Sequence, residues 1–123
     1  MRVLIYGGRD FQPTTSSYYF LDHVFNYELA DWEMEEITLV SGGARGADSY
    51  GEDYAASYGY TVDRFPADWN THSKAAGHIR NQQMLDSGID LAVEFPGGRG
   101  TADMRRRLDK AGVKVIEYKE RDE

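Results

Sequence analysis

The chain has 123 residues, a net charge of −7 and no cysteine. The lack of cysteine excludes disulfides, thiolate catalysis and cysteine-based zinc sites, and no apolar run approaches the roughly 20 residues that cross a bilayer. Proteins that grip nucleic acid through its phosphates usually carry a basic face, so the acidic balance argues against nucleic acid and is compatible with a small anion. We expect a single domain, residues 1–123, that is cytoplasmic and makes no contact with membranes.

Five short β-rich runs alternate with helical patterns along the chain. The expected strands cover residues 2–6, 36–40, 60–65, 89–95 and 113–118, and the expected helices cover 15–31, 47–58, 73–86 and 101–111. Three of the runs are nearly continuous in apolar residues, which is typical of parallel strands covered on both faces. The pattern therefore predicts an α/β fold: a doubly wound sheet of about five mainly parallel strands in the order 3-2-1-4-5, with helices on both faces.

Three glycine-rich turns each follow an expected strand and lead toward an expected helix. They are Gly7-Gly8 and the segments 41–48 and 96–101. Such turns direct backbone N–H groups and a helix N-terminus at an anion. Ligands of doubly wound sheets bind beyond the C-terminal strand ends, where the strand order reverses, so we expect the three turns to converge on one nucleotide-type ligand. The P-loop and Gly-x-Gly-x-x-Gly fingerprints are missing, which argues against a P-loop NTPase and an ordinary NAD enzyme; we expect no resident cofactor.

Polar residues in two of these turns have two interpretations each. Thr101 is a natural N-cap for the helix after it, and its hydroxyl could cap that helix or bind a phosphate oxygen. Arg99 is either a phosphate contact or a solvated turn residue. Asp48 falls in the first turn of its helix, where it could serve the helix end or bind a ribose hydroxyl.

The segment 68–84 is unusually polar for a connection that enters a helix. Lys74, Arg80 and Asn81 are its candidate ligand contacts, because an arginine one or two turns into the helix could neutralise a phosphate. The alternative is an exposed helix surface. His72 and His78 are six residues apart, a poor spacing for one helix face, so we expect no metal site.

Two further patterns concern surfaces. Tyr50, Tyr54 and Tyr58 recur at helical spacing and predict a stripe that faces either the core or a second subunit, so a homo-oligomer is possible. The three arginines at 105–107 occupy successive helix positions and cannot all face one ligand. We expect them to form a solvated face.

Four segments, taken together and in order, resemble the YspA-type, cpYpsA-related branch of the SLOG superfamily, which is named after the SMF/DprA proteins and the LOG enzymes. They are residues 3–11, 41–48, 74–81 and 96–104, and the resemblance covers nearly the whole chain. It implies a Rossmann-like fold and a nucleotide-related ligand. Members of this branch occur in bacteria and their phages.

Two relatives within the superfamily imply different activities. LOG enzymes are phosphoribohydrolases that cleave the N-glycosidic bond of a nucleoside monophosphate, and a glutamate three residues after the threonine of their Pro-Gly-Gly-x-Gly-Thr motif is catalytic. Met104 stands at that position here, which favours a binding or sensor module over a hydrolase. A hydrolase would need another carboxylate near the sugar, and Asp10, Asp48 and Asp103 are the candidates.

DprA binds single-stranded DNA, and its Ser-Gly-x-Ala-x-Gly-x-Asp turn resembles residues 41–48; the acidic balance argues against the same role here. We therefore expect a nucleotide or nucleotide-derived ligand. Its phosphate would rest at segment 96–101, with charge from Arg80 and Arg9, and segment 41–48 would approach the sugar or a second phosphate. The expected ligand contacts are Gly7, Gly8, Arg9, Ser41, Gly42, Gly43, Gly46, Asp48, Lys74, Arg80, Asn81, Gly97, Gly98, Gly100 and Thr101.

Overall fold

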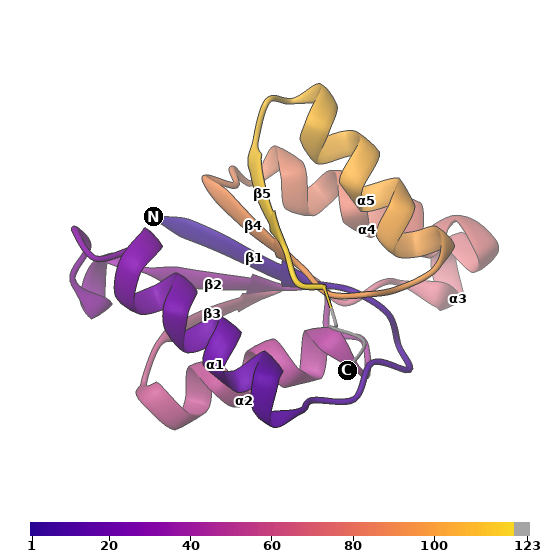
Figure 1. The fold of residues 1–123 in the computed structure, drawn as a ribbon. Coiled ribbons are helices and arrows are strands. Elements are labelled where there is room, and N and C mark those ends of the chain that lie inside the picture. Colours follow the sequence, from indigo (N-terminus) through magenta and orange to yellow (C-terminus); the bar gives the residue numbers. More distant parts are fainter. Residues whose placement is uncertain (120–123) are drawn as a thin grey trace.

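A computed structural model describes residues 1–119, and it contains one sheet of five parallel strands (Figure 1). The strand order is β3-β2-β1-β4-β5, which confirms the predicted order 3-2-1-4-5. The chain thus begins in the middle of the sheet, builds one half outward and then returns to build the other. The strands are β1 (Arg2–Tyr6), β2 (Thr38–Ser41), β3 (Thr61–Arg64), β4 (Leu91–Glu94) and β5 (Lys114–Glu117).

Helices follow every strand except the last, with two departures from the prediction. The expected helix 15–31 is α-helical only as far as His23 and continues as a π-helical turn, Val24–Glu28. The helix expected over residues 73–86 is α-helical from Ala76, and a short α-helix, Trp69–His72, precedes it. Ser73, with a φ of 49°, interrupts the helical backbone between the two. The helices are α1 (Thr15–His23), α2 (Ala47–Tyr58), α3 (Trp69–His72), α4 (Ala76–Asp86) and α5 (Arg99–Lys110), with 3-10 turns at Met34–Glu36 and Ser73–Ala75.

The sheet lies between two helical layers, α1 and α2 on one face and α4 and α5 on the other (Figure 1). Side chains of β1 alternate between the two cores. Val3 and Ile5 belong to the cluster that includes residues of α1 and α2, whereas Leu4 and Tyr6 pack with Met84 of α4 and with α5. Burial on both faces explains why the central strands read as continuous apolar runs.

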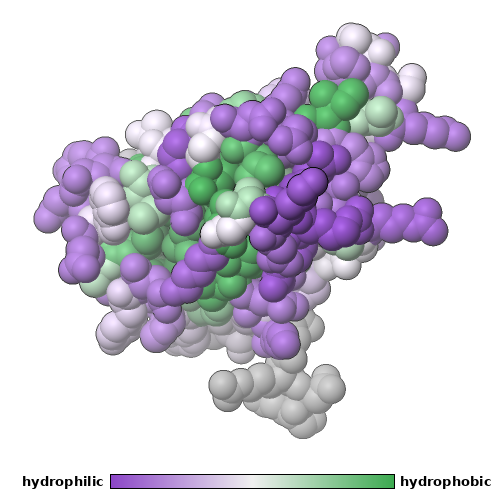
Figure 2. Space-filling view, turned by 90° about the horizontal axis from the view of Figure 1, so that it is seen from above, coloured by the Kyte–Doolittle hydropathy of each residue, from purple (hydrophilic) through white to green (hydrophobic). Residues whose placement is uncertain are grey.

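The outer surface of the α4–α5 layer is largely polar. Seen from above, hydrophilic residues cover most of this face and a strip of hydrophobic residues reaches the surface between them (Figure 2). α5 is amphipathic: it turns Met104 and Leu108 into the core and keeps its three arginines among polar partners. Within residues 1–119, no helix has both the length and the apolar character that a membrane span requires.

The predicted tyrosine stripe lies along α2. Tyr50 and Tyr54 are buried in the core, while Tyr58 is about half exposed. The hydroxyls of Tyr54 and Tyr58 both donate to Asp22 of α1, at 2.9 and 3.2 Å. The stripe therefore packs α2 against α1, and a homo-oligomer stays a prediction.

Candidate functional site

The three glycine turns meet at the carboxyl edge of the sheet. Gly8 N–H donates to the Pro96 carbonyl at 2.9 Å, and Ala47 N–H donates to the Gly8 carbonyl at 3.1 Å. The turn after β1 is thus held between the turns that precede α2 and α5. The contact is close enough that a Cβ on Gly97 would lie 2.6 Å from the Gly8 nitrogen. Glycine is needed here because the three backbones approach one another directly.

A cavity of about 370 Å³ opens where these turns meet α3 and α4. Its volume is within the range of small-molecule sites. Ten of the residues expected to contact a ligand line it: Gly7, Gly8, Arg9, Asp48, Lys74, Arg80, Asn81, Gly98, Gly100 and Thr101.

The other five expected contacts do not line this cavity but support its walls. The Ser41 hydroxyl donates to Glu52 at 2.8 Å and accepts from Gly43 N–H at 3.1 Å, so it fixes its own turn. Gly42 lies behind Arg80, and Gly46 and Gly97 pack on the turn after β1. These residues shape the site through the backbone.

The cavity lining is cationic, although the whole chain is acidic. Arg9, Lys74, Arg80 and Arg99 line it, against a single carboxylate, Asp48. This gathering of positive charge in one concave place favours a ligand that carries negative charge. The Arg9 guanidinium also lies 5.3 Å from the centre of the Trp69 ring, a cation–π contact at the cavity rim.

The N-terminus of α5 differs from the prediction. The helix begins at Arg99, with Gly98 in the N-cap position, so the prediction that Thr101 is the N-cap is wrong. Gly98 and Gly100 have open space around them and let the helix start two residues earlier. No side chain caps this helix end, so its first N–H groups are not satisfied by the helix or by a cap, and Gly98, Gly100 and Thr101 all line the cavity.

Asp48 is the buried acid of the site, 6% exposed. Its Oδ2 accepts a hydrogen bond from Ala44 N–H at 3.2 Å. Burial raises the pKa of Asp48 to about 6, against the smaller lowering effects of that hydrogen bond and of Arg80 and Arg9. A carboxyl group with such a pKa can hold or release a proton near neutral pH, which is what acid–base chemistry on a bound ligand needs.

We expect Asp48→Asn to stabilise the protein above about pH 6. The native carboxyl binds its proton more tightly than the unfolded one, so the wild type loses stability as the pH rises from about 4 to about 6. A shift from 3.8 to about 6 corresponds to about 2–3 kcal/mol, and the amide avoids this cost. Urea unfolding at about pH 5 and pH 8 should show the gain mainly at the higher pH; a variant that is destabilised at both would contradict the assignment.

Arg80 and Asn81 tie three elements together. Arg80 donates through Nη1 to the Gly42 carbonyl and through Nε to Asn81 Oδ1, the latter at 3.1 Å. Asn81 Nδ2 in turn donates to Asp103 of α5 at 3.0 Å. Burial lowers the pKa of Arg80. The arginine thus lines the cavity while its Nη1 holds α4 to the turn after β2 and its Nε orients Asn81 on the same helix.

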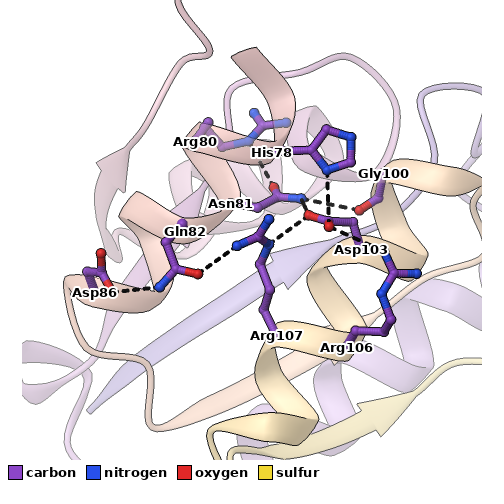
Figure 3. Close-up of polar contacts among 9 residues, drawn as sticks. All are labelled: His78, Arg80, Asn81, Gln82, Asp86, Gly100, Asp103, Arg106 and Arg107. Carbon is purple, nitrogen blue, oxygen red and sulfur yellow. Dashed lines mark hydrogen bonds and ion pairs between the residues drawn. The ribbon is translucent and has the colours of Figure 1, made fainter. Parts of the chain in front are cut away.

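The structure places the other two candidate acids outside the cavity. Asp10 is almost fully exposed and pairs with Arg45 at 3.2 Å. Asp103 is 5% exposed and points from α5 to α4, where its carboxylate accepts hydrogen bonds from four side chains (Figure 3). The buried contacts of Asp103 favour a structural role, whereas the exposed pair of Asp10 contributes little to stability. Of the three, Asp48 alone lines the cavity.

The prediction that the arginines at 105–107 form a solvated face holds only for Arg106, whose side chain is 71% exposed, and is wrong for the partly buried Arg105 and Arg107. Arg106 and Arg107 pair with Asp103 at 3.3 and 2.8 Å, and Arg105 pairs with Glu94 at 3.3 Å. Arg107 also donates to Gln82 of α4 at 2.7 Å (Figure 3). Arg105 and Arg107 thus join α5 to β4 and α4 through the carboxylate of Glu94 and the side chain of Gln82.

Eight cavity residues were not among the predicted contacts. Trp69, Gly77, His78 and Met84 belong to the polar segment 68–84, which was singled out as a whole, and Ala44 and Arg99 belong to predicted turns. Tyr6 and Met104 are core residues, whose access to the cavity depends on the packing around them. The eight are Tyr6, Ala44, Trp69, Gly77, His78, Met84, Arg99 and Met104.

Comparison with known proteins identifies a family and a phage relative. A model of the YspA, cpYpsA-related SLOG family matches residues 1–72. The chain is 35% identical over 128 residues to the Gene 61 protein of Mycobacterium phage D29, an alignment that covers 95% of each protein. No solved structure matches it. Because the family model matches more than half of the chain and the phage relative aligns along nearly all of it, the chain belongs to the YspA, cpYpsA-related SLOG family.

Proposed function

We propose that this protein binds a nucleotide or nucleotide-derived ligand in the cavity at the glycine turns, as a binding or sensor module. The observation that carries the proposal is the cationic lining of a small cavity beside an uncapped helix N-terminus, in a chain of net charge −7. Membership of the SLOG family agrees with a nucleotide-related ligand.

The lining suggests how such a ligand would lie. A phosphate would rest on the first N–H groups of α5, near Gly98, Gly100 and Thr101, where the helix dipole favours negative charge. Lys74 and Arg99 would add charge. Asp48 would accept a hydrogen bond from a sugar hydroxyl, and Trp69, half exposed at the rim, offers a flat surface for a base.

We expect nucleoside monophosphates to raise the unfolding temperature of the protein. A ligand at 100 times its Kd adds about 2.7 kcal/mol of stability.

Lys74→Ala and Arg99→Ala should each weaken binding about 10-fold, because a charge-assisted hydrogen bond to phosphate is lost. Neither side chain makes an ion pair within residues 1–119.

Lys110→Ala is the matched control, since this lysine is exposed in the last turn of α5, away from the cavity. It should leave the affinity unchanged. Binding that falls equally in all three variants would indicate a general charge effect rather than this site. Salt-sensitive retention of oligonucleotides without any response to mononucleotides would favour single-strand binding instead.

A second candidate function is hydrolysis of the N-glycosidic bond of a nucleotide. The specific observation in its favour is Asp48, a buried cavity carboxyl whose pKa is raised to about 6 by burial. Asp48 could take over the acid–base role of the LOG glutamate, which Met104 at that position cannot perform. Release of free base from nucleoside monophosphates, abolished in Asp48→Asn, would establish this activity and exclude a pure sensor.

A further inference from the structure

His78 couples the cavity to the buried carboxylate of Asp103. Its Nδ1 lies 3.0 Å from Asp103 Oδ1, and the histidine side chain is 55% exposed whereas the aspartate side chain is 8% exposed. His78 lines the cavity and Asp103 does not. Figure 3 shows the pair: the imidazole projects from α4, and the carboxylate meets it from α5.

The surroundings of Asp103 determine which ring nitrogen carries the proton. Burial raises the pKa of Asp103, but hydrogen bonds from Arg107, Asn81 and His78 outweigh it and hold the pKa well below its usual range. An ionised carboxylate can only accept hydrogen bonds. Nδ1 of His78 must therefore be the donor, and in the neutral ring Nε2 carries the lone pair.

This lone pair matters because free acceptors are scarce among the cavity side chains. The guanidinium and ammonium groups that line the cavity are donors without exception. Asn81 Oδ1 already accepts from Arg80, and the Tyr6 hydroxyl, which donates to Glu94 at 2.7 Å, belongs to a residue that is only 4% exposed. The other side-chain acceptors of the cavity are Asp48, the Thr101 hydroxyl and Nε2 of His78, which makes no hydrogen bond within residues 1–119. A phosphate needs donors, and a sugar hydroxyl needs an acceptor.

We propose that His78 accepts a hydrogen bond from a ligand hydroxyl through Nε2, with Asp103 as the positioning residue that fixes its tautomer and orientation. This inference rests on the proposed nucleotide binding. It makes His78 a specificity residue: the site selects a hydroxylated sugar phosphate over the same phosphate without sugar hydroxyls.

The first test compares two probes on each variant. They are the tightest binder among AMP, GMP, CMP and UMP, and its 2′,3′-dideoxy counterpart. His78→Ala should weaken binding of the ribonucleotide about 5-fold, as expected for one hydrogen bond, and leave the dideoxy affinity unchanged. His72→Ala, on α3 outside the cavity lining, is the control and should change neither affinity.

The outcomes separate the two proposals. If no mononucleotide binds the wild type, nucleotide binding and this inference both fail. If the ribonucleotide binds but His78→Ala weakens both probes equally, or neither, the specificity role alone is overturned.

The second test reads the tautomer directly by nitrogen-15 NMR of the imidazole rings at alkaline pH. The chain has 3 histidines, so His78→Gln assigns the signal. The wild type should show the proton on Nδ1. In Asp103→Asn, the remaining oxygen stays with Arg107 and Asn81, and the amide nitrogen takes the position of Oδ1, where it faces His78 and Arg106. The Arg106 side chain is 71% exposed and can turn to solvent. The proton should then move to Nε2.

Asp103→Asn should also reduce the preference for the ribonucleotide over its dideoxy counterpart by about 5-fold, as His78→Ala does, although His78 is intact. A purely structural role for Asp103 predicts no change of tautomer. Thermal unfolding checks that the variant is folded. A wild-type ring with its proton on Nε2 would overturn the proposal.

Discussion

Replacing Asp103 with alanine should lower the free energy of unfolding by about 3–5 kcal/mol, the cost of breaking a buried ion pair from one side. Its carboxylate receives Arg107 Nε at 2.8 Å and Asn81 Nδ2 at 3.0 Å. Without it, Arg107 Nε loses its acceptor between α4 and α5, and Asn81 Nδ2 keeps only the Gly100 carbonyl at 3.3 Å. Urea unfolding at pH 7 measures the loss.

Asp109→Ala is the matched control for this prediction. Asp109 also pairs with an arginine four positions away on α5, at 3.0 Å from Arg105, but its side chain is 59% exposed. Exposed pairs of this kind contribute about 0–1 kcal/mol. Equal losses in the two variants would contradict the structural role that burial gives to Asp103.

The stabilisation by Asp103 also has a definite pH dependence. The hydrogen bonds hold the pKa of the folded carboxyl below its usual range. Its contribution is therefore complete above the unfolded pKa of about 4 and is lost as the pH falls from there toward the folded value. The difference between wild type and Asp103→Ala should be constant near neutrality and narrow below about pH 4. A difference that grew on acidification would contradict the sign.

Gly46→Ala is expected to cost about 3–5 kcal/mol, from backbone strain and overpacking together. Gly46 has a φ of +77° and a ψ of −125°, which side chains rarely allow. An added Cβ would also collide with the carbonyl oxygens of Gly8 and Arg9. These atoms are backbone and cannot rotate away, so the turns after β1 and β2 would have to separate.

Gly100→Ala serves as the comparison for Gly46→Ala. It lies in the first turn of α5, and nothing is within 4 Å of an added Cβ. Its stability should stay within about 1 kcal/mol of the wild type. Ligand binding should be lost in Gly46→Ala, because the turns that form the cavity would no longer converge. A Gly46→Ala protein with wild-type stability would show that the close contact between Gly46 and the turn after β1 is not needed.

The strand order and the meeting of the glycine turns were predictable because they depend on local pattern and chain connectivity. Continuous apolar strands with short helical crossovers leave few topologies open. Residues 7–8, 41–48 and 96–101 each come directly after a strand of that sheet, so a parallel arrangement brings them to one edge. Their glycines marked the places where backbones touch.

Helix boundaries were less predictable. The start of α5 at Arg99 and the break at Ser73, whose φ of 49° is rare for a residue with a side chain, are not indicated by the residue types at those positions. Thr101 has the chemistry of an N-cap, but flanking glycines permit an earlier start. Local propensity ranks these alternatives only weakly.

The sequence alone determined the parallel fold and the edge at which its glycine turns gather, since both follow from periodicity and the handed connection of strands. From the sequence alone, Asp10, Asp48 and Asp103 were equal candidates for a catalytic carboxylate. Tertiary structure separated them, leaving the first in solvent, directing the second into the cavity, and surrounding the third with donors from α4 and α5. The same long-range contacts brought His78 to the site. The physical reason is that a carboxylate's charge and access depend on desolvation and on partners far along the chain, which local pattern does not encode.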